Sequence, residues 1–132
     1  MLLPFRLCAP AASIALGLFA STASASVHVT TFQTPSHRIL CGYERGDDDP
    51  AHIRCDLRFL DGRAAYLWPT GKAFIDGADD VIADPGTASV LAYGHSRRFG
   101  QFRCTSRATG LTCVNRTDQH GFTVSREHRR MF

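Results

Sequence analysis

The side chains that could act as nucleophiles, acids or bases do not form a recognisable catalytic motif. His95 and Ser96 follow Gly94 as in a nucleophile elbow, but the second glycine of that turn is absent. The six histidines include no pair with a convincing metal-ligand spacing. The acidic residues between 76 and 84 do not fit a calcium-loop spacing, so we expect a solvated loop there. We therefore expect no enzyme, no metal site and no cofactor.

A small secreted nuclease would need a histidine, a carboxylate and an arginine brought together. Glu44, Glu127, His120 and Arg126 could supply such a set. Small domains commonly offer these residue types, so the set indicates no reaction by itself. A small secreted hydrolase or nuclease remains the least favoured function.

Five residues remain as candidate ligand contacts. His120 precedes Gly121 and Phe122, between a polar loop and the last expected strand. We favour a tight entry into that strand, with a hydrogen bond from His120 to neighbouring backbone. The alternative is a histidine that faces a ligand beside Arg126. The candidate binding residues are His120, Arg126, Arg97, Arg98 and Tyr93.

Charge divides this 132-residue chain of net charge +3 into an acidic middle and a basic end. Residues 44–84 hold ten acidic and five basic residues, whereas residues 95–132 hold eight arginines and two acidic residues. The basic part could bind an anionic partner such as an envelope polymer, a nucleic acid or an acidic protein. We favour the interpretation in which the two halves fold against each other and neutralise. Because Phe99 and Phe102 look like core residues rather than interleaved stacking groups, we expect no specific nucleic acid.

The N-terminal residues 1–25 are typical of a signal peptide. Arg6 is followed by an apolar run over 7–20, which is shorter than a typical membrane-spanning helix, and then by the small-x-small sequence of residues 23–25. We expect cleavage after Ala25, and a secreted or periplasmic protein. A membrane anchor or a core helix is the alternative. No later segment is apolar enough to span a membrane.

An even number of cysteines would remain after that cleavage, which favours disulfides in an exported protein. Four cysteines allow three pairings. Alternating polar and apolar residues flank the turn at 46–50, so a hairpin would place Cys41 opposite Cys55 on the core face. A second hairpin around residues 107–110 would place Cys104 opposite Cys113. We therefore predict the pairs Cys41–Cys55 and Cys104–Cys113; the spacings do not suit a structural zinc site.

Short alternating segments separated by turn residues predict a mainly β protein. We expect residues 26–132 to form one domain, a small disulfide-stapled antiparallel sandwich or barrel. Asp76–Thr87 is expected to be a loop, and residues 127–132 a half-turn of helix or a tail. The expected strands are 27–32, 38–43, 52–59, 64–68, 72–75, 89–93, 98–106, 111–115 and 121–126.

Several short motifs are spread along the chain. They are Pro35-Ser36, Ile39 with Cys41, Arg54-Cys55-Asp56, Tyr93-Gly94, Cys104 with Gly110-Leu111-Thr112-Cys113-Val114-Asn115, and His120-Gly121-Phe122-Thr123-Val124-Ser125-Arg126-Glu127. In these motifs the chain resembles a family of small exported bacterial domains of unknown function. The resemblance implies an exported β domain and no assigned reaction. The chain departs from the family pattern at His37 and Gln119, where glycine is usual, and between Leu60 and Val81, where many members have two more cysteines.

These observations favour a non-catalytic binding or structural domain at the bacterial envelope or outside the cell. Its expected partner is an anionic envelope polymer or an extracellular protein. The alternative is an inhibitor of a wall-degrading enzyme, similar in kind to the small periplasmic lysozyme inhibitors. The signature residues of those inhibitors are not found in this sequence.

Overall fold

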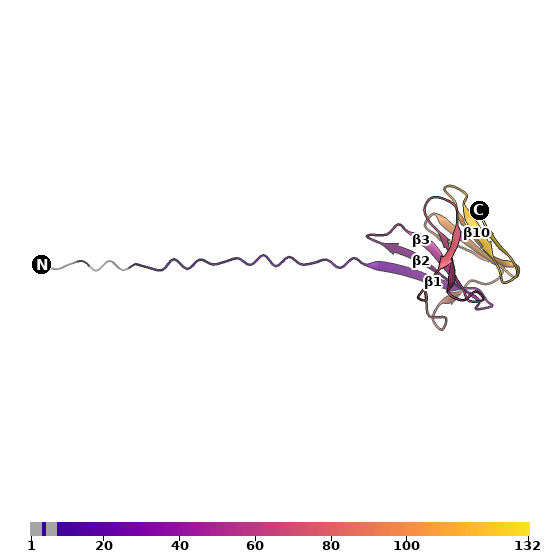
Figure 1. The fold of residues 1–132 in the computed structure, drawn as a ribbon, viewed down its shortest axis with the longest axis horizontal. Helices are drawn as coiled ribbons and strands as arrows, with labels where there is room; N and C mark the ends of the chain where they lie inside the picture. The colour runs from indigo at the N-terminus through magenta and orange to yellow at the C-terminus, as the bar shows by residue number, and fades with distance from the viewer. Residues whose placement is uncertain (1–3, 5–7) are drawn as a thin grey trace.

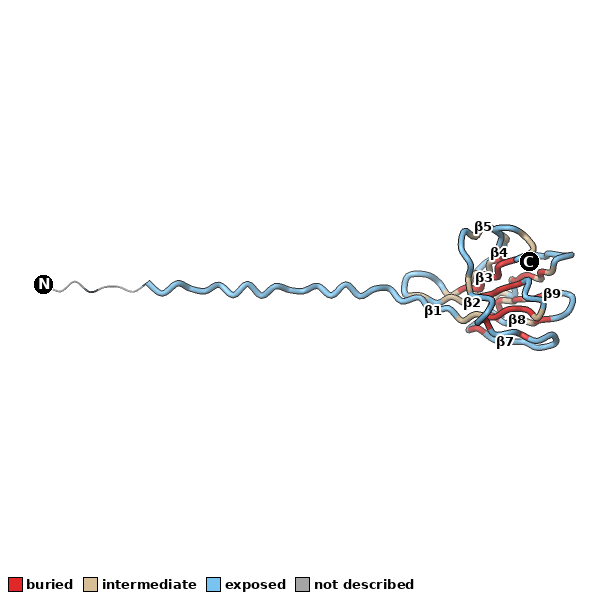
Figure 2. Tube along the Cα trace, turned by 90° about the horizontal axis from the view of Figure 1, so that it is seen from below, coloured by how far each residue is buried: buried red, intermediate tan, exposed pale blue. Residues whose placement is uncertain are grey.

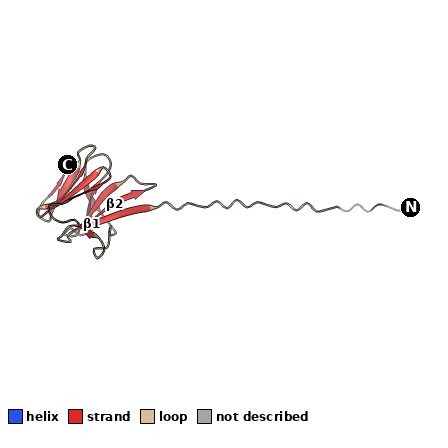
Figure 3. Ribbon diagram, turned by 180° about the vertical axis from the view of Figure 1, so that it is seen from behind, coloured by secondary structure: helices blue, strands red, loops and turns tan. Residues whose placement is uncertain are grey.

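The computed structural model describes Pro4 and residues 8–132, and its folded part is a sandwich of two β-sheets (Figure 1). The described residues form strands and loops and no helix (Figure 3). The predicted mainly β fold is therefore confirmed. The strands are β1 (Val27–Gln33), β2 (Ile39–Gly46), β3 (His52–Leu57), β4 (Arg63–Leu67), β5 (Phe74–Gly77), β6 (Ser89–Val90), β7 (Ser96–Phe99), β8 (Phe102–Arg107), β9 (Gly110–Asn115), β10 (Gly121–Val124) and β11 (Arg129–Met131).

Each sheet is mostly a meander, in which strands that follow one another in the chain lie side by side. Sheet A has the order β5-β4-β3-β2-β1-β6, and sheet B has the order β11-β10-β9-β8-β7. All pairs are antiparallel except β1 with β6. Loop 78–88 leaves β5 and delivers the two-residue strand β6 to the other edge of sheet A. The chain then enters sheet B, so the first and second halves of the domain form separate layers.

Residues 8–25 lead away from the sandwich as an extended chain with exposed side chains (Figures 1 and 2). The expected signal peptide also includes residues 1–3 and 5–7, which lie outside the described residues. Across the described part of the chain, no helix has the length and apolar character needed to cross a membrane.

The core lies between the sheets and is filled by alternate residues of each strand (Figure 2). In β8, Phe102 and Cys104 are buried, while Arg103 and Arg107 between and beyond them are exposed. The same alternation runs through β9 and β10. Phe32 of sheet A stacks on Phe99 of sheet B, with 5.0 Å between the ring centroids, and so joins the two layers.

Two disulfides cross-link paired strands inside this core. Cys41 lies opposite Cys55 in β2 and β3, with 4.0 Å between their Cα atoms. Cys104 lies opposite Cys113 in β8 and β9, with 4.1 Å between theirs. Both predicted pairings are confirmed. Each sheet thus carries one bond that holds two of its inner strands in register.

The single strand expected over 98–106 is wrong, because the chain turns back within it. Phe99 pairs with Phe102, and Gly100 with Gln101 forms a two-residue turn between β7 and β8. Gly100 has a φ of 56°, which suits the first position of a type II′ hairpin turn. The added strand β7 becomes an edge of sheet B.

The half-turn of helix or tail expected over 127–132 is also wrong. Residues 129–131 form β11, which pairs with β10. Beyond that pairing, Gly121 and Phe132 each donate a backbone N–H to the other's carbonyl, at 2.8 and 2.9 Å. The strand expected over 89–93 is shorter than expected, since only Ser89 and Val90 pair with β1.

A buried cation fastens loop 78–88 to the outer face of sheet A. Arg54 Nε donates a hydrogen bond to Asp56 Oδ1, and Arg54 Nη1 donates one to Asp80 Oδ1, both at 2.8 Å. The Ile82 N–H donates to the other oxygen of Asp56 at 2.9 Å. Ile82 then lies against Gly42, where any Cβ would overlap its side chain. Glycine at position 42 therefore allows the loop to lie close to the sheet.

The contact between Arg54 and Asp80 predicts a stability change in acid. The hydrogen bond from Arg54 holds the pKa of the Asp80 carboxyl below its ordinary value. A lowered carboxyl pKa contributes stability that is present above the unfolded value of about 3.9 and is lost as the pH falls through the folded pKa. We expect Asp80→Asn to lower the free energy of unfolding at pH 6, and we expect the difference from the parent to disappear as the pH falls below the folded pKa of Asp80. Urea unfolding across this pH range measures the effect; parallel profiles for the two proteins would contradict it.

Two residues other than glycine adopt the left-handed backbone conformation in the described part of the chain. His37 has a φ of 58° and Gln119 has a φ of 66°. At both positions, glycine is usual in the family pattern that the chain resembles. A side chain costs roughly 1 kcal/mol in this conformation, whereas glycine adopts it readily. The imidazole of His37 contacts the side-chain oxygen of Gln33 at 2.9 Å, which offsets part of the cost at that position.

We therefore expect Gln119→Gly to raise the free energy of unfolding by about 1 kcal/mol. His37→Gly should raise it less, because that change also removes the contact with Gln33. Guanidinium unfolding of the two variants and the parent measures both values. A destabilised Gln119→Gly variant would contradict the strain at this turn.

Candidate functional site

The two charged parts of the sequence lie in different layers of the sandwich. All ten acidic residues between 44 and 84 belong to strands of sheet A or to its loops. All eight arginines of residues 95–132 belong to sheet B or to its loops. The domain therefore has an acidic side and a basic side.

The arginines of the basic side have no carboxylate partner among the described residues. The ion pairs within that part of the chain are Glu44 with His52, and Arg54 with Asp56 and Asp80, and all of them lie in sheet A and its loops. The two halves therefore fold against each other as expected, but no contact ion pair joins them in the described chain. The strands of the two sheets meet through apolar inner faces, so most of the charges lie on opposite outer sides; Arg97 and Arg129 instead lie at the inner edge, over the rings of Phe99 and Phe59.

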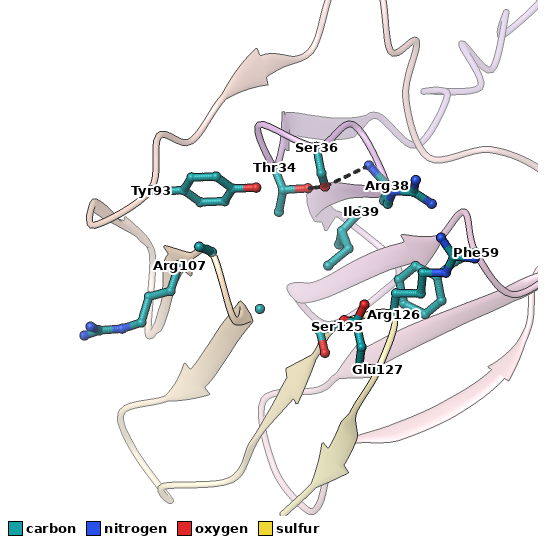
Figure 4. A pocket seen from close by; sticks show the side chains of 12 residues that line it. Thr34, Ser36, Arg38, Ile39, Phe59, Tyr93, Arg107, Ser125, Arg126 and Glu127 are labelled. Atoms are coloured by element: carbon teal, nitrogen blue, oxygen red, sulfur yellow. Dashed lines mark hydrogen bonds between the residues drawn. The ribbon is translucent and has the colours of Figure 1, made fainter.

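Tyr93 and Arg126, two of the predicted binding residues, line one groove of about 240 Å³. The groove lies where the β1–β2 connection of sheet A meets the β8–β9 and β10–β11 connections of sheet B (Figure 4). The Tyr93 hydroxyl points toward the hydroxyls of Thr34 and Ser36 in that view. Those two hydroxyls are 3.0 Å apart, and the backbone N–H of Arg38 donates to Ser36 at 3.3 Å.

The guanidinium groups around the groove do not converge on one point. Those of Arg38 and Arg126 lie on the same side of the groove, whereas that of Arg107 points away on the opposite side (Figure 4). Glu127 also lines the groove but forms no ion pair with any of the three. Hydroxyls beside two cations suit a small acidic group, such as a carboxylate or a phosphate.

Sequence reasoning identified Tyr93 and Arg126 but missed Thr34, Ser36 and Arg38 as groove residues. Pro35-Ser36 and the segment 125–127 are among the motifs on which the resemblance rests, and both meet at the groove. These two motifs could therefore have indicated the groove. The sequence alone did not show that they meet, because they are far apart in the chain and the packing of the two sheets brings them together.

Arg97 and Arg98 do not act together, because neighbouring residues of a strand point to opposite faces. The Arg97 guanidinium lies 4.9 Å from the ring centroid of Phe99, and its Nη1 donates to Ser89 Oγ at 3.4 Å. Arg98 lies opposite Arg103 on the outer face of sheet B. Two predicted binding residues are thus assigned to different surfaces.

His120 is at the far end of β10 from Arg126, so the two do not form one site. Its backbone N–H donates to Asp118 Oδ1 at 3.0 Å, and its carbonyl accepts a hydrogen bond from Asn115 at 2.7 Å. These contacts organise the turn that leads into β10. Asn115 itself is fully buried and donates to the carbonyl of Pro69 at 2.8 Å.

The residues considered for catalysis are dispersed. Glu44 contacts His52 on sheet A at 2.6 Å, while Glu127 lies at the groove and His120 lies at the other end of β10. Ser96 Oγ is hydrogen-bonded with Thr105 Oγ1 at 2.7 Å rather than with a histidine or a carboxylate. In the region that the structure describes, no three histidine, cysteine, aspartate or glutamate side chains are grouped so as to hold a metal ion.

Comparison with known proteins gives one match. Residues 44–132 match the family of unknown function DUF6636, and this region includes β3 to β11 and both charged halves. No curated protein matches the chain, and no solved structure matches it. The chain belongs to the family of unknown function DUF6636.

Proposed function

We propose that this chain is an exported, non-catalytic binding domain that holds an anionic partner on its basic side. The observation that carries the proposal is the set of eight arginines on sheet B without a carboxylate partner in the described chain. Like charges gathered on one surface destabilise the folded state and attract a partner of opposite charge. An anionic partner would satisfy these arginines.

Export is supported by three features. Residues 1–25 combine an early arginine, an apolar run and a small-x-small sequence. Residues 8–25 lie outside the sandwich, so their removal would leave the core intact. The two buried disulfides, Cys41–Cys55 and Cys104–Cys113, are of the kind that persists in oxidising compartments.

The character of the basic side favours an anionic partner over a protein enzyme target. Interfaces that bind proteins tightly depend on large apolar or aromatic anchor residues. The exposed large hydrophobic side chains of the folded domain all precede residue 95, and none belongs to sheet B. The dispersal of Glu44, Glu127 and His120 supports a role without catalysis.

Export is tested by expressing the full chain in a bacterium with a general secretory pathway. The protein recovered outside the cytoplasm should begin at Ser26 and should contain no free thiol after unfolding. Arg6→Glu should slow its export, because the charge before the apolar run would be reversed. An intact chain retained in the cytoplasm would contradict this part of the proposal.

Binding is tested by retention on immobilised heparin, a sulfated polymer used here as a generic polyanion. We expect retention at low ionic strength that falls steeply as salt rises, because ionic contacts with a polyanion release counterions. Lysozyme activity should be unchanged in the presence of the protein, which separates polyanion binding from enzyme inhibition. Elution at low ionic strength, or stoichiometric loss of lysozyme activity, would overturn the proposal.

A further inference from the structure

We propose that the outer face of sheet B is the docking surface for an extended anionic polysaccharide. This inference rests on the proposed function and names both the surface and the ligand class. It concerns a face separate from the groove that contains Tyr93 and Arg126. Arg107 lies between the two, since it lines the rim of the groove while its guanidinium points away from it (Figure 4).

Strand alternation and register define this face. Buried residues on β8, β9 and β10 alternate with exposed or half-buried ones, so every second side chain points outward. Residues directly opposite each other in antiparallel strands point to the same side. The outer face is therefore formed by Ser96, Arg98, Arg103, Thr105, Arg107, Thr112, Val114, Thr123, Arg130 and Phe132.

A row of hydroxyl groups crosses the middle of the face. Ser96, Thr105, Thr112 and Thr123 are paired in register across β7, β8, β9 and β10. Ser96 contacts Thr105 at 2.7 Å, and Thr112 contacts Thr123 at 2.8 Å. Each hydroxyl has one donor and two acceptor positions, so a paired hydroxyl still has capacity for a ligand.

Four arginines surround the hydroxyl row. Arg98 lies directly opposite Arg103, a placement of like charges that destabilises a sheet. Arg107 is four residues along β8 from Arg103, which corresponds to about 13 Å. Arg130 pairs with Thr123 at the other side of the sheet, three strands or roughly 14 Å from β8. No acidic side chain is part of this face.

The arginines on several sides of the flat row of hydroxyl groups fit a polymer that carries both hydroxyls and regularly spaced anions. A chain of acidic sugars has this chemistry: its hydroxyls can bond to the threonine row, and its carboxylates or sulfates can meet the arginines. The length of the face suits an extended chain better than a single small anion.

The face lacks the groups that other polyanions require. Single-stranded nucleic acid needs exposed aromatic rings for its bases. The ring of Phe132 lies on this face over Gly121, is half-buried, and has the Arg130 guanidinium 5.0 Å from its centroid. Membrane binding needs apolar side chains that enter the lipid, whereas Val114 and Phe132, the large apolar residues of this face, are both half-buried.

The test uses an oligogalacturonate long enough to span the sheet, titrated calorimetrically into the purified protein at fixed salt. The triple variant Arg98→Gln, Arg103→Gln and Arg130→Gln should bind about tenfold more weakly, since it removes three exposed ionic contacts. The matched control, Arg45→Gln with Arg58→Gln and Arg63→Gln on sheet A and its loops, should bind within about twofold of the parent. A separate groove variant, Arg38→Gln with Arg126→Gln, tests the alternative site. Circular dichroism checks that each variant is folded.

A second pair of changes separates recognition of hydroxyls from charge alone. Thr112→Val with Thr123→Val keeps the charge and the shape of the face and removes two hydroxyls. We expect about fivefold weaker binding to the oligogalacturonate and no change in retention on a simple sulfonate resin. Equal binding by this variant and the parent would overturn the polysaccharide assignment.

The remaining outcomes also decide the inference. Loss of binding in the groove variant alone would overturn it and leave the proposed function standing. Tighter binding of single-stranded DNA, or of vesicles with anionic lipid, than of the oligogalacturonate would overturn the ligand class. Failure to bind heparin and the oligogalacturonate alike would reject the proposed function together with this inference.

Discussion

Strand alternation is the constraint on which the rest of this structure depends. Both sheets must direct every second side chain into one thin core, so the charged residues of the inner strands point to the outer faces. Arg97 and Arg129, on the edge strands β7 and β11, are instead on the inner side and lie against Phe99 and Phe59. In β8 this places Arg103 and Arg107 outside because Phe102 and Cys104 fill the inside. The two halves of the chain form separate sheets, and the charge imbalance of the sequence consequently becomes a charge difference between two sides of one domain.

The outer faces of the two sheets differ in how far their charges are neutralised within the protein. Loop 78–88 covers part of sheet A and is held by the Arg54, Asp56 and Asp80 network, so acidic charge on that side is partly neutralised within the protein. On sheet B, Arg98 and Arg103 are opposite each other and exposed. Each disulfide stabilises the fold by about 3 kcal/mol in the chain-entropy model, which offsets the cost of such like-charge pairs. The fold can therefore keep a binding surface that is unfavourable for its own stability.

Local chemistry made part of the fold predictable. The alternating residues around Cys41 and Cys55, with strong turn residues between them, predicted one hairpin and its disulfide, and the same reasoning succeeded for Cys104 and Cys113. The turn at Gly100 was missed because a single glycine followed by a polar residue, between Phe99 and Phe102, also fits a continuous strand. β11 was missed because its strand character comes from pairing with β10 rather than from its own sequence.

The candidate sites were less predictable because they depend on contacts between distant segments. The groove joins residues near 36, 93, 108 and 126, and only the stacking of the two sheets brings these together. Arg97 and Arg98 were both predicted as binding residues, and β7 places them on opposite faces. Whether the acidic and basic residues lie near one another or on separate sides depends on which sheet each strand joins. The alternation of residues within one strand does not predict which sheet that is.

The most direct test of the account is to map the bound polyanion on the domain by nuclear magnetic resonance. Amide and methyl signals are followed while an oligogalacturonate is titrated into the isotopically labelled protein. We predict that the largest shifts occur at Thr105, Thr112 and Thr123 and their neighbours on the outer face of sheet B. Shifts concentrated at Tyr93 and Ser36 in the groove, or on sheet A around Asp80, would contradict the account.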